Sequence, residues 1–350
     1  MADTKETSIA NRGRPATAYD VARLAGVSQS AVSRTFTVGA SVSEGTRLKV
    51  LEAAQKLKYR PSHMASSLKT RRSYIVGLAV THLDNQFYPP IIEKLSEALR
   101  QAGYRILLFV THGDINFDPA LDELLRYRVD ALILASTSLS SALAQDCRDA
   151  GVPVVMVNNV DPESAIASVA GDNYKGGETI AAFLHAGGHQ RYGYISGVES
   201  SSTSREREAG FNSFFASQGL PPPVRAISNY RPESGMTAAR HLLASPTPPD
   251  ALFCVNDQMA IAAMEVARHE FGLEVGRDIS IVGFDNTAMS AWPSFSLTTY
   301  SQPADQLVAS TMTLLEAVME RTDAPIEHVI VPGQLIVRTS ARLPNGFSPA

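Results

Sequence analysis

Amide, carboxylate, guanidinium and aromatic side chains gather in five short segments, most of which follow an apolar run. These segments are 81–88 (THLDNQFY), Asn158-Asn159, Arg205-Glu206-Arg207, Asn256-Asp257 and Asp285-Asn286. Amides and carboxylates hydrogen-bond several hydroxyls at once, and arginine forms bidentate pairs with a set of hydroxyls or an acid. Aromatic rings stack on the apolar face of a sugar ring. The composition therefore indicates a binding site for a sugar, a sugar acid or a nucleobase-like ligand.

The same residues do not form a catalytic pattern. The sequence has no Walker A, GxGxxG or HExxH motif, and no nucleophile with a local base. His82 and His112 lack a third metal ligand, and Cys147 and Cys254 each stand alone in apolar stretches. We therefore expect a protein that is not an enzyme, with neither a cofactor nor a metal.

Alternating apolar strands and amphipathic helices must position these segments. The expected strands are 74–80, 104–110, 129–135, 152–158, 192–197, 224–228, 251–256 and 279–285, and the expected helices 89–102, 120–126, 140–150, 174–186, 204–218, 232–244 and 257–270. Continuous apolar strands between helices predict parallel sheets with both faces covered. So many strands favour two doubly wound α/β lobes, which bind ligands at the carboxyl ends of their strands.

The charges divide the chain in two. Residues 1–72 carry 13 Lys/Arg and 5 Asp/Glu, whereas residues 73–350 carry 18 Lys/Arg and 30 Asp/Glu. The basic block either offsets phosphate charge or is a solvated tail. No run of 18 apolar residues and no signal-like N-terminus occur, so we expect a cytoplasmic protein with no membrane partner.

The basic block predicts three short helices, at 19–25, 29–35 and 43–57. Thr17, Ser28 and Ser43 are the candidate N-caps, and Gly26 is placed at the turn. The expected core positions are Val21, Ala22, Leu24, Ala25, Ala31, Val32, Leu48, Val50, Leu51 and Ala54. Exposed Gln29, Ser30, Ser33 and Arg34 on the second helix are typical of a helix-turn-helix that reads DNA bases. An ordinary three-helix bundle is the alternative.

The strings TAYDVARLAGVSQSAVSRTF and VSEGTRLKVLEAAQKLKYRPSHMASSLKTRRS closely resemble the N-terminus of LacI/GalR-type transcriptional repressors. The resemblance implies a hinge helix at Ser62–Lys69, with Leu68 inserted into the minor groove; packing of Leu68 as a linker residue is the alternative. The implied DNA-binding residues are Thr17, Tyr19, Ser28, Gln29, Ser30, Ser33, Arg34, Tyr59, Ser62, Met64, Ala65, Leu68 and Lys69. Arg12-Gly-Arg-Pro15 resembles an AT-hook core, or is a basic tail.

VNDQMAIAAM, ISIVGFDN and LTTYSQPADQL resemble the periplasmic-binding-protein-like core of the same family. The resemblance implies a pocket between two lobes joined by three crossovers. The implied effector contacts are Thr81, Asn85, Phe87, Tyr88, Asn158, Asn159, Arg205, Tyr230, Asn256, Asp285, Trp292 and Gln302. Strand-end capping is the alternative for Asn256 and Asp285, core packing for Phe87 and Tyr88, and loop packing for Trp292. Asn158-Asn159 departs from the acidic and basic pair of many sugar-binding relatives.

The expected organisation is a flexible basic arm (1–15), a helix-turn-helix domain (16–60), a hinge (61–72), an effector and dimerisation domain (73–342) and a tail (343–350). Within the effector domain we expect an N-lobe of about 73–160 plus 302–330 and a C-lobe of about 161–301 plus 331–342. The absence of C-terminal leucine heptads predicts a homodimer.

The expected function is a repressor of carbohydrate utilisation, released from a pseudo-palindromic double-stranded DNA operator by a small sugar-like effector. A corepressor-dependent regulator is one alternative. A cytoplasmic sugar-binding receptor and an enzyme carrying a helix-turn-helix are two more, which the basic block and the lack of a catalytic pattern respectively disfavour.

Overall fold

The computed structural model describes residues 14–37, 39–60, 72–81, 83–110, 126–135, 141–160, 165–320 and 326–344. The chain forms two compact units, Met1–Ser73 and Tyr74–Ala350, which are considered separately below. No helix within the described ranges is long and apolar enough to cross a membrane.

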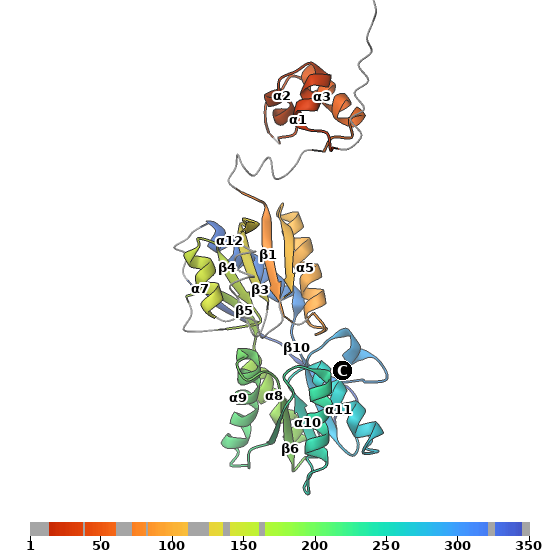
Figure 1. The fold of residues 1–350 in the computed structure, drawn as a ribbon. Coiled ribbons are helices and arrows are strands. Elements are labelled where there is room, and N and C mark those ends of the chain that lie inside the picture. Colours follow the sequence, from red (N-terminus) through yellow and green to blue (C-terminus); the bar gives the residue numbers. More distant parts are fainter. Residues whose placement is uncertain are drawn as a thin grey trace, which may run out of the picture. The chain divides into compact units, whose positions relative to one another are not determined.

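The first unit contains helices α1 (Ala18–Ala25), α2 (Gln29–Thr35) and α3 (Glu44–Lys56) (Figure 1). All three predicted N-caps are confirmed: Thr17, Ser28 and Ser43 accept hydrogen bonds from the amides of Asp20, Ala31 and Thr46. Gly26 ends α1 at φ 65°, a left-handed conformation that a glycine adopts without a Cβ penalty. Gly26 and the N-cap Ser28 therefore determine where α1 ends and α2 begins.

The core of this unit is smaller than the sequence predicted. Val21, Ala22, Val32, Val50, Ala53 and Ala54 form it. Leu24, Leu48 and Leu51, which were expected there, are 52%, 58% and 44% exposed. The prediction was wrong because the buried stripe of α3 follows Val50, Ala53, Ala54 and Leu57, and Leu48 and Leu51 lie off that helical face.

The second unit contains two six-stranded sheets, as the fold-class prediction required. The first has the order β11-β5-β4-β3-β1-β2 and the second β12-β10-β9-β8-β6-β7. The strands of the first sheet are β1 (Ile75–Val80), β2 (Arg105–Val110), β3 (Ala131–Ala135), β4 (Val154–Val157), β5 (Ala167–Gly171) and β11 (His328–Val331). Those of the second are β6 (Tyr192–Ser196), β7 (Val224–Ile227), β8 (Ala251–Cys254), β9 (Ser280–Asp285), β10 (Thr298–Ser301) and β12 (Leu335–Ile336). Neighbouring strands within the described ranges pair in parallel, except β10 with β12, which are antiparallel.

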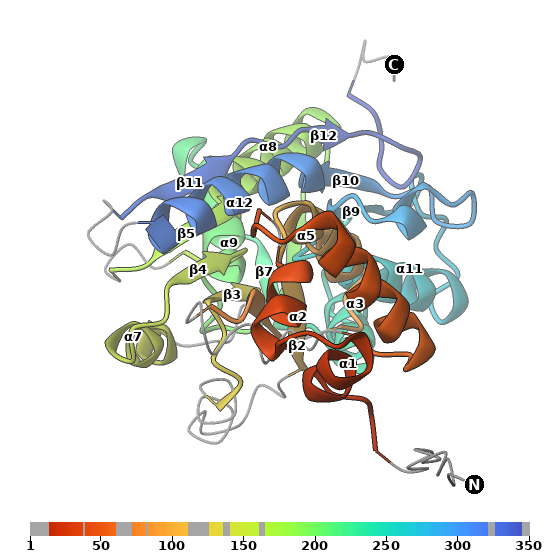
Figure 2. The ribbon, with the colours of Figure 1, turned by 90° about the horizontal axis from the view of Figure 1, so that it is seen from above.

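Helices cover the sheets of both lobes (Figure 1, Figure 2). The first lobe carries α5 (Tyr88–Gln101), α7 (Ser141–Asp149) and α12 (Ala304–Glu320). The second carries α8 (Asn173–Ala186), α9 (Ser202–Ser217), α10 (Pro232–Leu243), α11 (Asp257–His269) and the 3₁₀ turn η1 (Ala288–Ala291). Helix α8 packs on α9 and α10 on α11, so both pairs bury their apolar faces against the second sheet.

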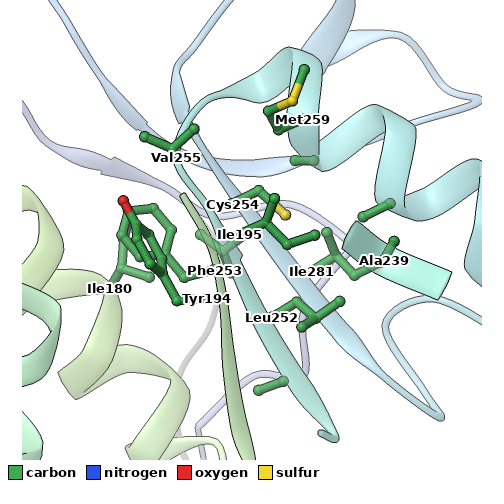
Figure 3. Packing of buried hydrophobic residues seen from close by; sticks show 14 of the residues in the cluster. Ile180, Tyr194, Ile195, Ala239, Leu252, Phe253, Cys254, Val255, Met259 and Ile281 are labelled. Atoms are coloured by element: carbon green, nitrogen blue, oxygen red, sulfur yellow. The ribbon is translucent and has the colours of Figure 1, made fainter. Parts of the chain in front are cut away.

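Alternating side chains of β8 build the core of the second lobe on both faces of its sheet (Figure 3). Phe253 packs against Tyr194 at 5.1 Å between ring centroids and lies near Ile180 of α8. Leu252 and Cys254 point to the other face, toward Ala239 of α10. Burial on both faces makes this strand continuously apolar, which is why the sequence revealed it.

The chain crosses between the lobes three times: after β5, after β10 and after β11. The first crossing follows Gly171, so the predicted lobe boundary at about residue 161 is wrong. Strand β5 was not predicted, because its sequence ASVAG is short and rich in small residues. It pairs with β4 and β11 and therefore belongs to the first lobe.

Candidate effector pocket

A pocket that is partly open to solvent lies between the two lobes at the carboxyl ends of their strands. This is the position at which doubly wound sheets bind ligands. Its lining consists of polar and aromatic side chains: Asn85, Tyr88, Asn158, Thr203, Arg207, Tyr230, Asn256 and Asp285. The first lobe supplies the loop after β1 and the residue after β4, and the second supplies α9 and the ends of β7, β8 and β9.

Arg207 is the cation of this pocket and is almost fully buried. Its Nε donates to Asn173 Oδ1 at 2.9 Å and its Nη1 to the Val255 carbonyl at 2.5 Å. Its guanidinium carbon lies 3.7 Å from the centroid of the Phe284 ring. These contacts hold the guanidinium fork in one plane, so its remaining N–H groups are preorganised for a partner.

Asp285 faces Arg207 at the end of β9. Arg207 Nη2 lies 3.4 Å from Asp285 Oδ1, to which Gln302 Nε2 also donates at 2.7 Å. Burial raises the pKa of Asp285 to about 6, although Arg207 and Gln302 act in the opposite direction. Its backbone has φ 113°, which is strained for a residue with a Cβ. Strain at a buried carboxylate is typical of a binding site.

Asn158 and Asn256 each offer a buried polar atom that has no hydrogen-bond partner within the described part of the chain. These atoms are Asn158 Oδ1 and Asn256 Nδ2. Asn256 Oδ1 accepts from the Met259 amide at 2.9 Å and caps α11. The predicted alternative of strand-end capping is therefore correct for one atom of Asn256, while its other atom remains available to a ligand.

Two tyrosines, Tyr88 and Tyr230, form part of the pocket wall. Tyr88 is buried at the start of α5, and its hydroxyl lies 3.4 Å from Asn158 Nδ2. Burial raises the pKa of the Tyr88 hydroxyl well above its ordinary value, so it stays protonated. Tyr230 has φ 60°, and its hydroxyl lies 3.4 Å from those of Ser201 and Thr203. Both rings therefore present a flat surface together with a hydroxyl.

The structure brings six of the predicted effector residues to the pocket: Asn85, Tyr88, Asn158, Tyr230, Asn256 and Asp285. Gln302 contacts it indirectly through Asp285. Thr81, Phe87 and Asn159 are buried nearby and do not line it. Phe87 packs against Tyr88 in a T-shaped pair with centroids 5.3 Å apart, which matches the core-packing alternative.

Arg205 and Trp292 lie outside the pocket. Arg205 is exposed, and its Nη1 donates to the Ser200 carbonyl at 2.6 Å. Trp292 is 54% exposed and stacks on Phe295, which favours loop packing over a pocket lid. Arg207 was named only within the segment Arg205-Glu206-Arg207 and not among the effector contacts, and Thr203 was not predicted. The signal for Arg207 was its helical spacing to the buried Ser204 and Phe211, which places it on the inward face of α9.

The exposed surface of α2 carries Gln29, Ser30 and Arg34, as predicted for a helix that faces DNA, whereas Ser33, which was also predicted to face outward, is half-buried. Tyr19 is exposed, whereas Tyr59 is half-buried against Phe36 at 5.8 Å between centroids. Arg14 of the RGRP segment pairs with Asp20 at 3.3 Å. The predicted hinge residues Ser62, Met64, Ala65, Leu68 and Lys69, together with His82, His112 and the segment 120–125, lie outside the described residues.

No cluster of three or more His, Cys, Asp or Glu suited to a metal ion occurs in the described ranges. A helix-turn-helix unit joined to a two-lobed ligand-binding unit defines a ligand-responsive DNA-binding regulator. Residues 17–62 match the family described as bacterial regulatory proteins, lacI family, and residues 181–341 match a periplasmic binding protein-like domain.

Curated relatives match this chain over most of its length. The HTH-type transcriptional repressor PurR of Photobacterium profundum is 34% identical over 311 residues, covering 87% of this chain and 92% of that protein. The ribose operon repressor of Escherichia coli is 32% identical, covering 83% of this chain and 89% of that protein. The chain therefore belongs to the LacI family of transcriptional regulators. These relatives are repressors rather than enzymes.

A solved structure of the lac repressor dimer bound to operator and the anti-inducer ONPF superposes with a TM-score of 0.84. It is 29% identical, and the match covers 93% of this chain and 99% of that one. The likeness confirms the predicted fold of a helix-turn-helix plus two α/β lobes.

Proposed function

We propose that this protein represses carbohydrate-utilisation genes and leaves its operator when a sugar-like effector binds between the lobes. The observation that carries the proposal is the pocket lining, which combines the ion pair of Arg207 and Asp285 with one unpaired amide atom each of Asn158 and Asn256. Such a set donates to and accepts from several hydroxyls at once. A neutralised charge pair with amides and two tyrosines suits a polyhydroxylated ligand.

Recognition of DNA is assigned to the first unit. Gln29, Ser30 and Arg34 present short polar groups and one guanidinium to the base edges of a major groove. Two copies of the chain, related by a two-fold axis, would read the two halves of a pseudo-palindrome. The dimer, the hinge at 61–72 and the roles of Leu68 and Lys69 in the minor groove remain parts of this proposal. Binding to operators places the protein on the nucleoid in the cytoplasm.

Coupling follows from linkage between the two binding events. An effector that prefers one arrangement of the lobes shifts DNA affinity by no more than its own differential affinity for the two arrangements. Relatives support the class of effector, since one is named a ribose operon repressor. We therefore expect effector binding to weaken binding to DNA.

A thermal-shift screen of the full-length protein against sugars, sugar acids, polyols and nucleobases tests the effector class. A compound at 100 times its Kd adds about 2.7 kcal/mol to stability, which moves the midpoint by several degrees. A sugar hit that is lost in Arg207→Lys and kept in Arg205→Lys supports the proposal. A hit confined to nucleobases, or one that both variants keep, contradicts it.

A further inference from the structure

A buried carboxylate lies directly behind the pocket. Asp257, the first residue of α11, is 1% exposed and does not line the pocket. Its Oδ2 accepts from the Thr287 amide at 2.6 Å and from the Thr287 hydroxyl at 3.0 Å. Its Oδ1 accepts from the Thr299 hydroxyl at 2.5 Å. One carboxylate thus joins the start of α11 to the segment after β9 and to β10.

These hydrogen bonds hold the turn that presents Asp285. Asp285 and Asn286 have φ values of 113° and 56°. Such conformations are unfavourable for residues with a Cβ and persist only where the surroundings enforce them. The Asn286 amide donates to Thr299 Oγ1 at 3.2 Å, and that hydroxyl donates to Asp257. Both amides after Asp285 are therefore held by Asp257, one directly and one through Thr299.

The surrounding backbone makes room for this carboxylate. A Cβ at Gly283 of β9 would overlap Asp257 Oδ1, so glycine is required for the close approach. Asp257 also follows Asn256 directly in sequence, and Asn256 lines the pocket and caps α11. A shift of Asp257 would consequently move two pocket residues.

We propose that Asp257 is a positioning residue of the effector pocket, which holds the turn 285–287 and thereby sets the direction of the Asp285 carboxylate. The inference rests on the proposed function, because it takes the pocket as the effector site. Asp257 acts through the turn and makes no contact with the effector.

Charged neighbours make this role dependent on pH. Burial, followed by the charge of Asp285, raises the pKa of Asp257 to about 7. Arg338, which follows β12, interacts electrostatically with Asp257 and donates to Asn286 Oδ1 at 2.7 Å. Arg207 partly neutralises the negative charge of Asp285. The Cys254 thiol of β8 stays protonated, because burial and Asp257 raise its pKa. Protonation replaces an acceptor by a donor at Asp257, so the turn should loosen as the pH falls through about 7.

Trp292 reports on this turn without any ligand. It is the single tryptophan of the chain and ends η1, whose N-cap is Thr287. We would record its emission from pH 5.5 to 8.5 in the full-length wild type, Asp257→Asn and Asp250→Asn. Asp250 is the matched control, because its carboxylate also accepts from backbone amides, those of Gln190 and Arg191. A transition near pH 7 in the wild type and Asp250→Asn that is absent in Asp257→Asn is expected.

Ligand affinity tests the same role in the pocket. We would titrate D-ribose, D-glucose and D-galacturonate into these proteins and into Thr299→Val, with Thr311→Val as its buried control on α12. For any of these sugars that binds the wild type, Asp257→Asn and Thr299→Val should raise the Kd at least tenfold. Asp250→Asn and Thr311→Val should stay within about threefold of the wild type, even if they lower the thermal midpoint equally.

The outcomes separate the two proposals. Unchanged affinity in Asp257→Asn, or a fluorescence transition that persists in it, overturns the positioning role and leaves the effector site standing. Failure of every sugar to bind the wild type counts against the proposed function. The fluorescence comparison then decides on its own whether Asp257 holds the turn.

Discussion

Arg207 and Asp285 form a buried ion pair in the second lobe's part of the pocket lining, with Nη2 3.4 Å from Oδ1 and each side chain 3% exposed. Charges removed from water in this way are stabilised only when further hydrogen bonds satisfy them. Asn173, the Val255 carbonyl and Gln302 supply these bonds. The pair is therefore a rigid centre whose remaining donor and acceptor atoms are available to a ligand.

Replacing Arg207 by lysine keeps the positive charge but removes the planar guanidinium group with its several N–H donors. One ammonium cannot serve Asn173, Val255 and Asp285 together, so we expect a loss of about 1–3 kcal/mol in the free energy of unfolding. The effector-induced thermal shift should disappear as well. Arg205→Lys should change stability by about 0.5 kcal/mol or less, because Arg205 is exposed. Equal losses in both variants, measured by urea titration, would show that Arg207 has no special role.

The free energy of unfolding of the effector unit should decrease as the pH rises from about 4 to about 7. Burial raises the pKa of Asp257 to about 7 and that of Asp285 to about 6, above the ordinary aspartate value of 3.8. The folded state thus binds more protons than the unfolded state in this window, and stability decreases as the pH rises through it. Above pH 7 these two groups contribute no further change.

Comparison of wild type with Asp285→Asn isolates the effect from other carboxylates, such as Glu97, whose pKa of about 2 acts in the opposite sense at lower pH. Thermal midpoints measured every half unit should decline less steeply in the variant between pH 5 and 7. Parallel curves for the two proteins would mean that Asp285 ionises normally.

Gly197 provides space for Tyr230. A Cβ at Gly197 would overlap the Tyr230 ring, so Gly197→Ala should displace the ring, destabilise the unit by about 1–3 kcal/mol and weaken effector binding. Gly235→Ala is the control within the same lobe, because its Cβ meets the flexible end of Met259. Calorimetric titration should show affinity loss in Gly197→Ala alone. Normal affinity there would indicate that Tyr230 is not a pocket wall.

Much of the molecule could be predicted from its sequence, because its signals are local. The caps Thr17, Ser28 and Ser43 lie next to periodic apolar positions, and buried strands such as β8 read as continuous apolar runs. Short strands such as β12, of two residues, give no periodic signal. Helix α12 was left unassigned, although Leu307, Thr311, Leu314 and Leu315 have helical spacing.

The prediction of the pocket was least accurate on α9, where a shift of one or two positions changes the side of the helix on which a residue lies. Arg205 and Arg207 are two positions apart on α9, so they point in different directions, and only the helical phase distinguishes them. The role proposed for Asp257 could not be predicted from the sequence. It depends on Thr287 and Thr299, which lie 30 and 42 residues away in the sequence.

Base recognition by α2 is tested at Arg34. Its side chain is exposed, and we expect Arg34→Ala to change base preference at one half-site position by ~1–3 kcal/mol. Selection from a randomised duplex pool, followed by anisotropy titrations, measures this change. Arg23→Ala on α1 should leave the preference unaltered. A uniform loss on every duplex would instead make Arg34 a phosphate contact.

The most direct test of the account is the affinity of the full-length protein for its selected duplex, measured with and without the sugar that shifts its thermal midpoint. We predict that the saturating sugar raises the Kd for DNA at least tenfold in the wild type and leaves it unchanged in Arg207→Lys. A sugar that binds the wild type without altering the Kd for DNA would contradict the coupling between pocket and operator. A Kd that decreases would make the sugar a corepressor and contradict release by an inducer.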